Sequence, residues 1–155
     1  MMSAEAWIKH LNLESHPEGG FFQETYRSAA GSDGRHYSTA IYFLLRSQDI
    51  SAFHRIKSDE LWHFYAGSSL TLYILNEQGL SSHQLGSDFE KGQLPQVVIP
   101  AHQWFAAKVN EPNSYVLAGC TVAPGFDFAD FELAERNELI KTFPAHQDII
   151  TLLTR

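Results

Sequence analysis

The chain has 155 residues, of which 44% are hydrophobic, enough to form one domain (1–155) with a sizeable core. Its formal net charge of −7 argues against nucleic-acid or anionic-membrane partners, because binding them needs a basic patch. The single cysteine, Cys120, excludes an intrachain disulfide, and its apolar neighbours predict a buried and inert thiol. The sequence contains no long apolar run and no basic leader, so we expect a cytoplasmic protein that does not cross a membrane.

The order of the predicted elements indicates an all-β protein with helices only at its two ends. Apolar residues at helical spacing predict an amphipathic helix at 3–13, for which Ser3 is the expected N-cap. Apolar and aromatic segments separated by turn residues then predict strands at 21–27, 37–45, 50–56, 61–66, 70–75, 80–85, 96–99, 104–109 and 114–122. Two helices are predicted at 131–141 and 145–153. This spacing is typical of a β-sandwich or a β-barrel.

The segment 53–67 carries the strongest chemical signal in the chain. Strand alternation places Glu60 on one face with Trp62 and Phe64, and a carboxylate among aromatic rings is costly to bury without a partner. His54 is the nearest candidate partner, on the preceding strand of a predicted hairpin. The alternative is that both residues lie exposed on this hairpin.

The spacing in this segment resembles the first cupin motif, in which His-x-His is followed by a glutamate and then by a glycine. His54, Glu60 and Gly67 match the motif, whereas Ile56 replaces its second histidine. The later segment PAHQWF resembles the second cupin motif, with Phe105 at the position of its histidine.

A closer resemblance extends over most of the chain. Four segments look like the signature of one small cupin subfamily of unassigned function: HPEGGFFQETYRS at 16–28, STAIYFLL at 38–45, SDELWHFYAG at 58–67 and GCTVAPGFDFADFEL at 119–133. The resemblance implies a cupin jelly-roll barrel (a double-stranded β-helix), usually dimeric, with one cavity between its sheets. It implies no particular reaction, because a fold does not determine chemistry.

The predicted metal site is incomplete. Cupin metal sites usually use three histidines and one glutamate, and at these positions the chain offers only His54 and Glu60. Two protein ligands leave most of the shell of a divalent ion to water, so we expect at most a weakly held divalent metal and no firm cofactor. His63 points to the opposite face of its strand unless a β-bulge turns it inward, and otherwise it is a hydrogen-bonded residue of the sheet.

Without a metal, His54 and Glu60 form a candidate general acid–base pair. The rings of Trp62, Phe64 and Trp104 offer flat surfaces on which a sugar or a base can stack.

The first predicted strand adds candidate polar ligand-binding groups from Glu24, Tyr26 and Arg27, although only one alternate set can face inward. Arg27 suits a phosphate or a carboxylate, with a surface ion pair as the alternative. The segment 126–128 is either a plug or a lid at the end of the barrel.

Two classes of function follow from these residues. The first is an isomerase- or epimerase-like enzyme that acts on a sugar or nucleotide-sugar ligand, with His54 as base and Glu60 as its partner. The second is a non-catalytic protein that binds or senses a small molecule; a metal-dependent enzyme with a reduced ligand set is less favoured. We also expect a homodimer, because Tyr42, Tyr73 and Val97 indicate more apolar surface than one small barrel needs.

Overall fold

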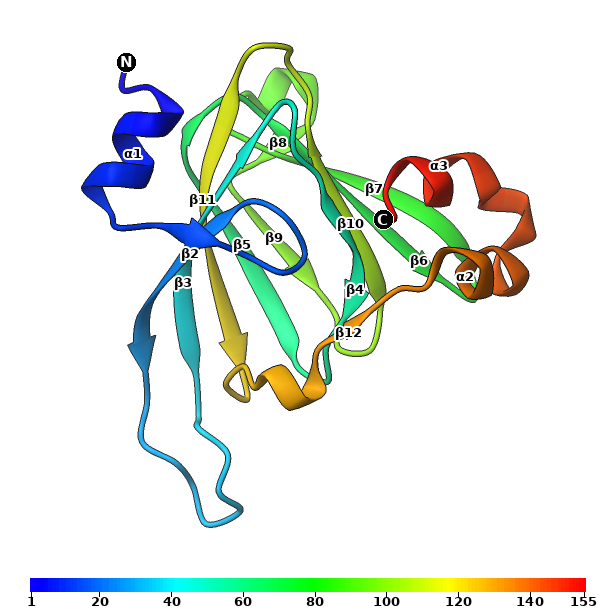
Figure 1. Ribbon diagram of the computed structural model, residues 1–155, viewed down its shortest axis with the longest axis horizontal. Coiled ribbons are helices and arrows are strands. Elements are labelled where there is room, and N and C mark those ends of the chain that lie inside the picture. Colours follow the sequence, from blue (N-terminus) through cyan, green and yellow to red (C-terminus); the bar gives the residue numbers. More distant parts are fainter.

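Two six-stranded sheets pack face to face in the computed structural model, which describes all 155 residues (Figure 1). The first sheet contains, in spatial order, β1 (Glu14–Ser15), β2 (Phe21–Arg27), β3 (Thr39–Arg46), β11 (Tyr115–Ala123), β5 (Asp59–Gly67) and β9 (Gln96–Ile99). The second sheet contains β12 (Glu132–Leu133), β4 (Ser51–Arg55), β10 (Trp104–Val109), β6 (Leu70–Asn76), β7 (Gly79–Leu85) and β8 (Gln93–Leu94). Strands β3 to β6 alternate between the two sheets, as do β9 to β12. This arrangement is the double-stranded β-helix expected from the sequence.

The helices lie at the two ends of the chain, on the outside of the barrel (Figure 1). They are α1 (Ala4–His10), α2 (Arg136–Thr142) and α3 (Gln147–Leu152), with short 3₁₀ turns η1 (Phe89–Lys91), η2 (Phe128–Asp130) and η3 (Pro144–His146). The Ser3 hydroxyl accepts a hydrogen bond of 3.1 Å from the Ala6 N–H, so Ser3 is the N-cap of α1 as predicted. None of the helices has the length and apolar character needed to span a bilayer.

The predicted helix at 131–141 begins five residues too early. Its first residues are extended, and Glu132 and Leu133 pair with β4 instead. The helix starts at Arg136 because the side chain of Glu135 accepts hydrogen bonds from the N–H groups of Asn137 and Glu138.

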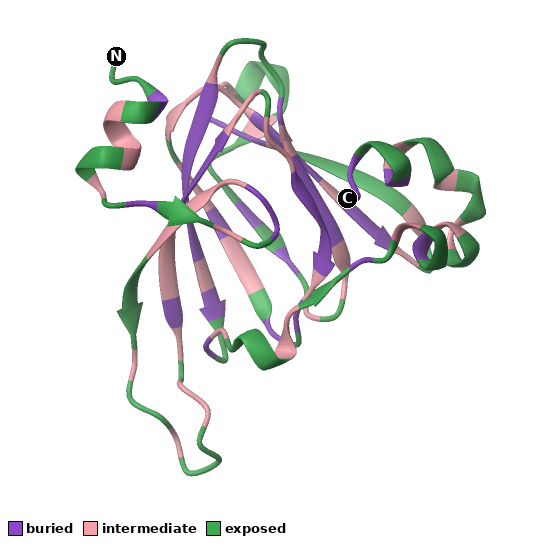
Figure 2. Cartoon of the chain, in the orientation of Figure 1, coloured by how far each residue is buried: buried purple, intermediate pink, exposed green.

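The main core fills the space between the sheets, where the strands are largely buried (Figure 2). It includes the fully buried rings of Phe43, Trp62 and Phe105. A second cluster lies under the C-terminal helices, and a third lies under α1. Two residues chosen as exposed apolar surface belong to these packed regions: Val97 lies in the main core, and Tyr73 packs under the C-terminal helices.

The predicted hairpin between His54 and Glu60 is wrong. Strand β4 pairs with β10 and β12, whereas β5 pairs with β11 and β9, so the two strands belong to different sheets. Residues 56–58 carry the chain from one sheet to the other. As a result, His54 and Glu60 approach the space between the sheets from opposite sides.

Candidate functional site

A cavity with a volume of about 60 Å³ lies between the two sheets. Four titratable side chains line part of it: His16, Glu18, His54 and Glu60. An apolar wall surrounds them, formed by Phe22, Ile41, Ile56, Cys120 and Val122. The remaining lining residues are the buried Thr39 and a partly exposed rim formed by Glu24, Arg27, Phe126, Phe128 and Phe131.

The turn between β1 and β2 places Glu18 in the barrel, and in Figure 1 this loop reaches from the first sheet toward β4. Gly19 and Gly20 have φ angles of +112° and +79°, which glycine adopts without strain. A Cβ atom at Gly19 would also overlap the carbonyl oxygen of Ile50. The Glu18 carbonyl accepts a hydrogen bond of 2.9 Å from the Ala52 N–H, so the turn is fastened to β4.

Glu18 and His54 form a buried ion pair in which Nε2 of His54 lies 2.6 Å from Oε2 of Glu18. The other ring nitrogen, Nδ1, lies 2.7 Å from the Ala52 carbonyl oxygen, which only accepts. Burial opposes the charge on His54, but the Glu18 carboxylate outweighs burial and raises the pKa of the imidazole. Burial likewise opposes the charge on Glu18, but His54 and His16 lower the pKa of that carboxyl group. His54 is therefore a cation that donates from both of its nitrogens.

His16 is a neutral hydrogen-bond donor. Its Nδ1 accepts a hydrogen bond of 3.1 Å from the backbone N–H of Glu18, so the ring hydrogen is on Nε2. Burial lowers the pKa of His16, and the nearby Glu18 carboxylate only partly offsets this effect. The Nε2–H makes no hydrogen bond within the protein, which leaves it available to a ligand in the cavity.

Glu60 is the group in the cavity that titrates near neutral pH. Burial and the negative charge of Glu18 raise its pKa to about 7, although the cationic His54 acts in the opposite direction. One carboxyl oxygen accepts a hydrogen bond of 3.2 Å from Trp62 Nε1, and the other makes no hydrogen bond within the protein. Glu60 can therefore exchange a proton with a bound molecule.

The β-bulge in β2 determines which polar side chains of that strand reach the rim. Between Glu24 and Tyr26 the pairing with β3 shifts register, so Glu24 and Arg27 both line the cavity. The expectation that only one alternate set faces inward is wrong for this reason. The Arg27 guanidinium donates to Glu24 at 2.5 and 3.3 Å and to the Phe126 carbonyl at 3.0 Å.

Five residues predicted to bind a ligand lie outside the cavity. Trp62 and Phe64 pack in or against the main core, where the indole of Trp62 contacts Phe43 and holds Glu60. Tyr26 is displaced by the bulge and is 56% exposed.

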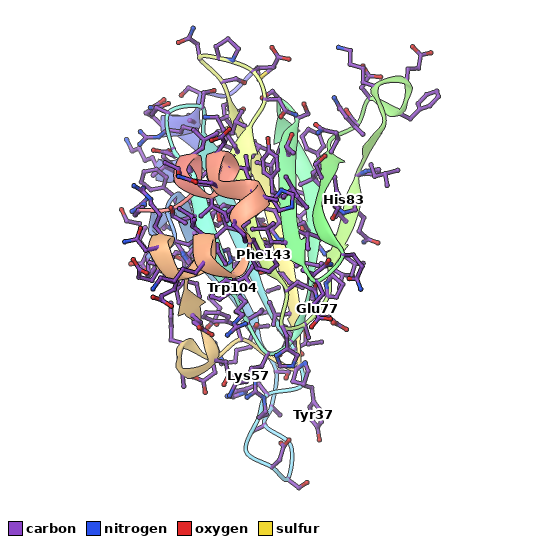
Figure 3. All side chains as sticks on the ribbon, turned by 90° about the vertical axis from the view of Figure 1, so that its right-hand side faces the viewer. Tyr37, Lys57, Glu77, His83, Trp104 and Phe143 are labelled. Carbon is purple, nitrogen blue, oxygen red and sulfur yellow. The ribbon has the colours of Figure 1, made fainter.

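Trp104 and His63 are turned away from the cavity by strand alternation. Because Phe105 faces inward, Trp104 faces the C-terminal helices, beside Phe143 (Figure 3) and under the Arg55 guanidinium, 4.3 Å from its ring. The His63 ring lies on the other face of β5 from Glu60, in hydrogen-bond contact with Thr121 and Gln96 at 3.1 Å each.

Sequence reasoning missed His16 and Glu18, which lie just before the first predicted strand. The glycines explain the conformation of the turn. A buried glutamate also requires a cationic or hydrogen-bonding partner, and the main partner of Glu18 is His54, which lies far along the sequence. The one available signal was the cupin-subfamily segment that begins at His16.

The donor set does not fit a cupin metal. At two of the four ligand positions, Ile56 and Phe105 have no donor atoms, and both ring nitrogens of His54 are engaged. No group of three or more His, Cys, Asp or Glu side chains is arranged to hold a metal ion. The side chains of the site therefore supply its acid–base chemistry.

The alternation of strands between two sheets and the cavity that they enclose define a cupin barrel. The chain belongs to the cupin superfamily, in the family described as Cupin superfamily (DUF985), whose model matches residues 5–134.

Solved structures from two organisms are similar to the chain over almost its whole length. Protein SO0799 from Shewanella oneidensis is 42% identical, with a TM-score of 0.95 over 100% of this chain and 99% of that one. A hypothetical protein from Leishmania major is 33% identical, with a TM-score of 0.92 over 99% of each chain. The uncharacterized protein YML079W of Saccharomyces cerevisiae is 27% identical over 158 residues, covering 90% of this chain and 79% of the yeast protein.

Oxalate decarboxylase from Bacillus subtilis shares the fold alone. It is 13% identical, with a TM-score of 0.59 over 90% of this chain and 36% of the decarboxylase chain.

Proposed function

We propose that the barrel cavity binds a small polar, sugar-like ligand and that the protein transfers a proton on it, as an isomerase or epimerase does. The observation that carries this proposal is the pairing of Glu60, with a pKa of about 7, with the neutral donor His16 in one cavity. Removal of a proton next to a carbonyl group needs a base of this kind and a donor for the developing oxyanion.

The roles differ from those expected from the sequence. Because both nitrogens of His54 donate, it cannot act as the base, and Glu60 takes that role. Glu60 removes the proton from the carbon beside the carbonyl, and the electron pair moves onto the carbonyl oxygen. His16 Nε2–H stabilises that oxygen in the resulting enediolate. Glu60 then returns the proton to the former carbonyl carbon, and the proton of the neighbouring hydroxyl passes to the oxygen on that carbon, so the carbonyl group has moved by one carbon; return of the proton to the opposite face of the original carbon gives the epimer instead. Glu18 is a positioning residue, because its charge contributes to the raised pKa of Glu60.

The size and charge of the cavity restrict the reacting end of the ligand. On the same measure a water molecule needs about 15 Å³ of cavity volume. The cavity of about 60 Å³ therefore suits a fragment of two or three carbons. The Glu18–His54 pair is neutral overall, and Glu60 repels an anion once it is ionised. These properties favour an uncharged hydroxycarbonyl group, with any larger part of the ligand extending past the rim.

Hydrogen exchange into the ligand tests this function. Dihydroxyacetone and glyceraldehyde incubated with the protein in D₂O should lose carbon-bound hydrogen faster than in buffer alone, as measured by NMR. Glu60→Gln should abolish the acceleration, whereas Glu132→Gln, which removes a surface partner of Arg55, should retain it. Equal exchange with the parent and Glu60→Gln would show that Glu60 is not the base.

Non-catalytic binding is the second candidate. It is favoured because Glu18 and His54 bond to each other rather than pointing their polar atoms at a ligand in the cavity. It predicts that a ligand raises the melting temperature through contacts with Glu60 and His16, while exchange stays at the buffer rate.

A further inference from the structure

A second, larger pocket adjoins the rim of the cavity. Its volume is about 340 Å³, and it shares Arg27, Phe126 and Phe128 with the cavity. Its other walls come from the loop between β2 and β3 and from the segment after β11, at the lower end of the barrel in Figure 1. We call this space the outer pocket. A ligand that fills the cavity and is longer than three carbons must extend into such a space.

The outer pocket contains two guanidinium groups that are already oriented. Arg27 uses one edge for Glu24 and one N–H for the Phe126 carbonyl, so one N–H remains on each terminal nitrogen. Arg35 lies 2.6 Å from Asp130 and donates to the Gly125 carbonyl at 3.4 Å, and its Nε–H makes no hydrogen bond within the protein. The carboxylates of Glu24 and Asp130 thus hold both guanidinium groups in place while donors on each remain unused.

The charges around the two spaces differ. The carboxyl groups of Glu18 and Glu60, and that of Glu24 at the rim, line the cavity. Asp127 is the single carboxylate that lines the outer pocket, and it accepts a hydrogen bond from the Ala129 N–H. Charge therefore disfavours an anionic group inside the barrel. Just outside it, the unused N–H groups of Arg27 and Arg35 match phosphate and carboxylate oxygens, although Glu24 and Asp130 already balance the charges of the two guanidinium groups.

We propose that the outer pocket binds an anionic substituent, a phosphate or a carboxylate, of the ligand whose uncharged end reacts in the cavity. This inference rests on the proposed function and specifies its substrate class as small hydroxycarbonyl compounds that carry such a group. Arg35 and Arg27 are the residues that recognise the anion.

Calorimetric titration with glycerol, glycerol 3-phosphate and glycerate tests the proposal, because these unreactive three-carbon probes differ at one end, which carries a hydroxyl, a phosphate or a carboxylate. Charge-assisted hydrogen bonds should make glycerol 3-phosphate or glycerate bind about tenfold more tightly than glycerol. The preferred probe identifies the anion. Arg35→Gln should remove most of the gain, and Arg35→Lys should retain part of it. Arg55→Gln, over Trp104 on the outside of the barrel, is the matched control and should leave the gain unchanged.

The outcomes separate this inference from the proposed function. Equal affinity for glycerol and both anions, with Glu60-dependent exchange intact, overturns the outer pocket and leaves the reaction standing. A gain that Arg35→Gln removes, without any exchange, supports the outer pocket and overturns the reaction. A gain lost equally in Arg55→Gln reflects general charge and overturns the outer pocket. Absence of binding by every probe overturns the inference.

Discussion

At the scale of single residues, the site is a set of charges whose protonation states depend on one another. Glu18 holds His54 as a cation, and the same negative charge keeps Glu60 protonated to higher pH. Trp62 fixes Glu60 by one hydrogen bond from within the core. A change at any of these residues should therefore alter the pH dependence of the protein as well as its stability.

The raised pKa of Glu60 predicts that this group destabilises the protein as the pH rises. Its pKa is 4.5 when unfolded and about 7 when folded, so the folded state holds more protons between these values. The free energy of unfolding should fall across this window by up to about 3.5 kcal/mol, at about 1.4 kcal/mol per pKa unit. Glu60→Gln should match the parent below pH 4.5 and be more stable at pH 8, as measured by urea denaturation. A stability difference between the two proteins that is independent of pH would contradict the raised pKa.

Loss of the Glu18 charge should change both stability and proton exchange. Glu18→Gln leaves His54 without its counter-charge, and breaking such a buried pair costs about 3–5 kcal/mol. It should also lower the pKa of Glu60, so any exchange activity should rise at lower pH than in the parent. Glu132→Gln, at a surface pair, should cost less than about 1 kcal/mol. A pH–rate profile that does not move in Glu18→Gln would remove the positioning role.

Part of this site could be predicted from the sequence. Cupin spacing on two strands that follow each other in the sequence pointed to His54 and Glu60, and both line the cavity. His16 and Glu18 could not be found in that way, because they meet His54 only when the first turn docks on β4. Trp104 was misplaced because a single strand has two apolar faces, and only tertiary packing shows which one is inside.

At the scale of elements, the segment 125–131, which we call the strap, forms one side of the rim of the cavity. The Phe131 ring stacks on His54 at 5.4 Å, and Asp130 lies 2.6 Å from Arg35 and 3.6 Å from Lys57. Helical periodicity suggested that a helix begins at 131, but these long-range contacts hold Phe131 outside any helix. We therefore expect that breaking these contacts would let the strap move and admit a ligand.

Reaction of Cys120 can measure this movement, because it is the single thiol and lies in the cavity wall. Asp130→Asn should weaken the attachment of the strap and increase the labelling rate by iodoacetamide several-fold. Asp88→Asn, which alters a surface pair with Lys91, is the control and should leave the rate unchanged. Equal rates in all three proteins, or labelling that follows global unfolding in urea, would count against a mobile strap.

At the scale of the whole molecule, the outer faces of the two sheets differ. The C-terminal helices cover part of the second sheet (Figure 1), whereas Tyr65 and Val98 on the first sheet are each 52% exposed. Alternation and turn signals were sufficient to predict a β-sandwich or a β-barrel, because both are local in sequence, and the cupin resemblance then implied the jelly roll. They could not assign strands to sheets, since successive strands cross between sheets without changing their local pattern.

The exposed face of the first sheet predicts a homodimer. Light scattering should report twice the chain mass of 17.5 kDa, and Val98→Arg should shift the protein toward monomer by placing a charge in the apolar contact. Tyr37→Arg, on an exposed loop (Figure 3), is the control and should remain dimeric. A monomer throughout a hundredfold dilution of the parent would exclude the dimer.

The order in which the chain contributes to the cavity also affects how the protein folds. Glu18 comes from the first turn, His54 and Glu60 from the middle of the chain, and Phe131 from the segment before the last helices. Contacts between such distant positions require closure of long loops, which slows folding. During synthesis, the cavity can be completed only after residue 131 has emerged, when both sheets are already present in the chain. A chain that stops before the strap therefore contains the acid–base residues but lacks the enclosure around them.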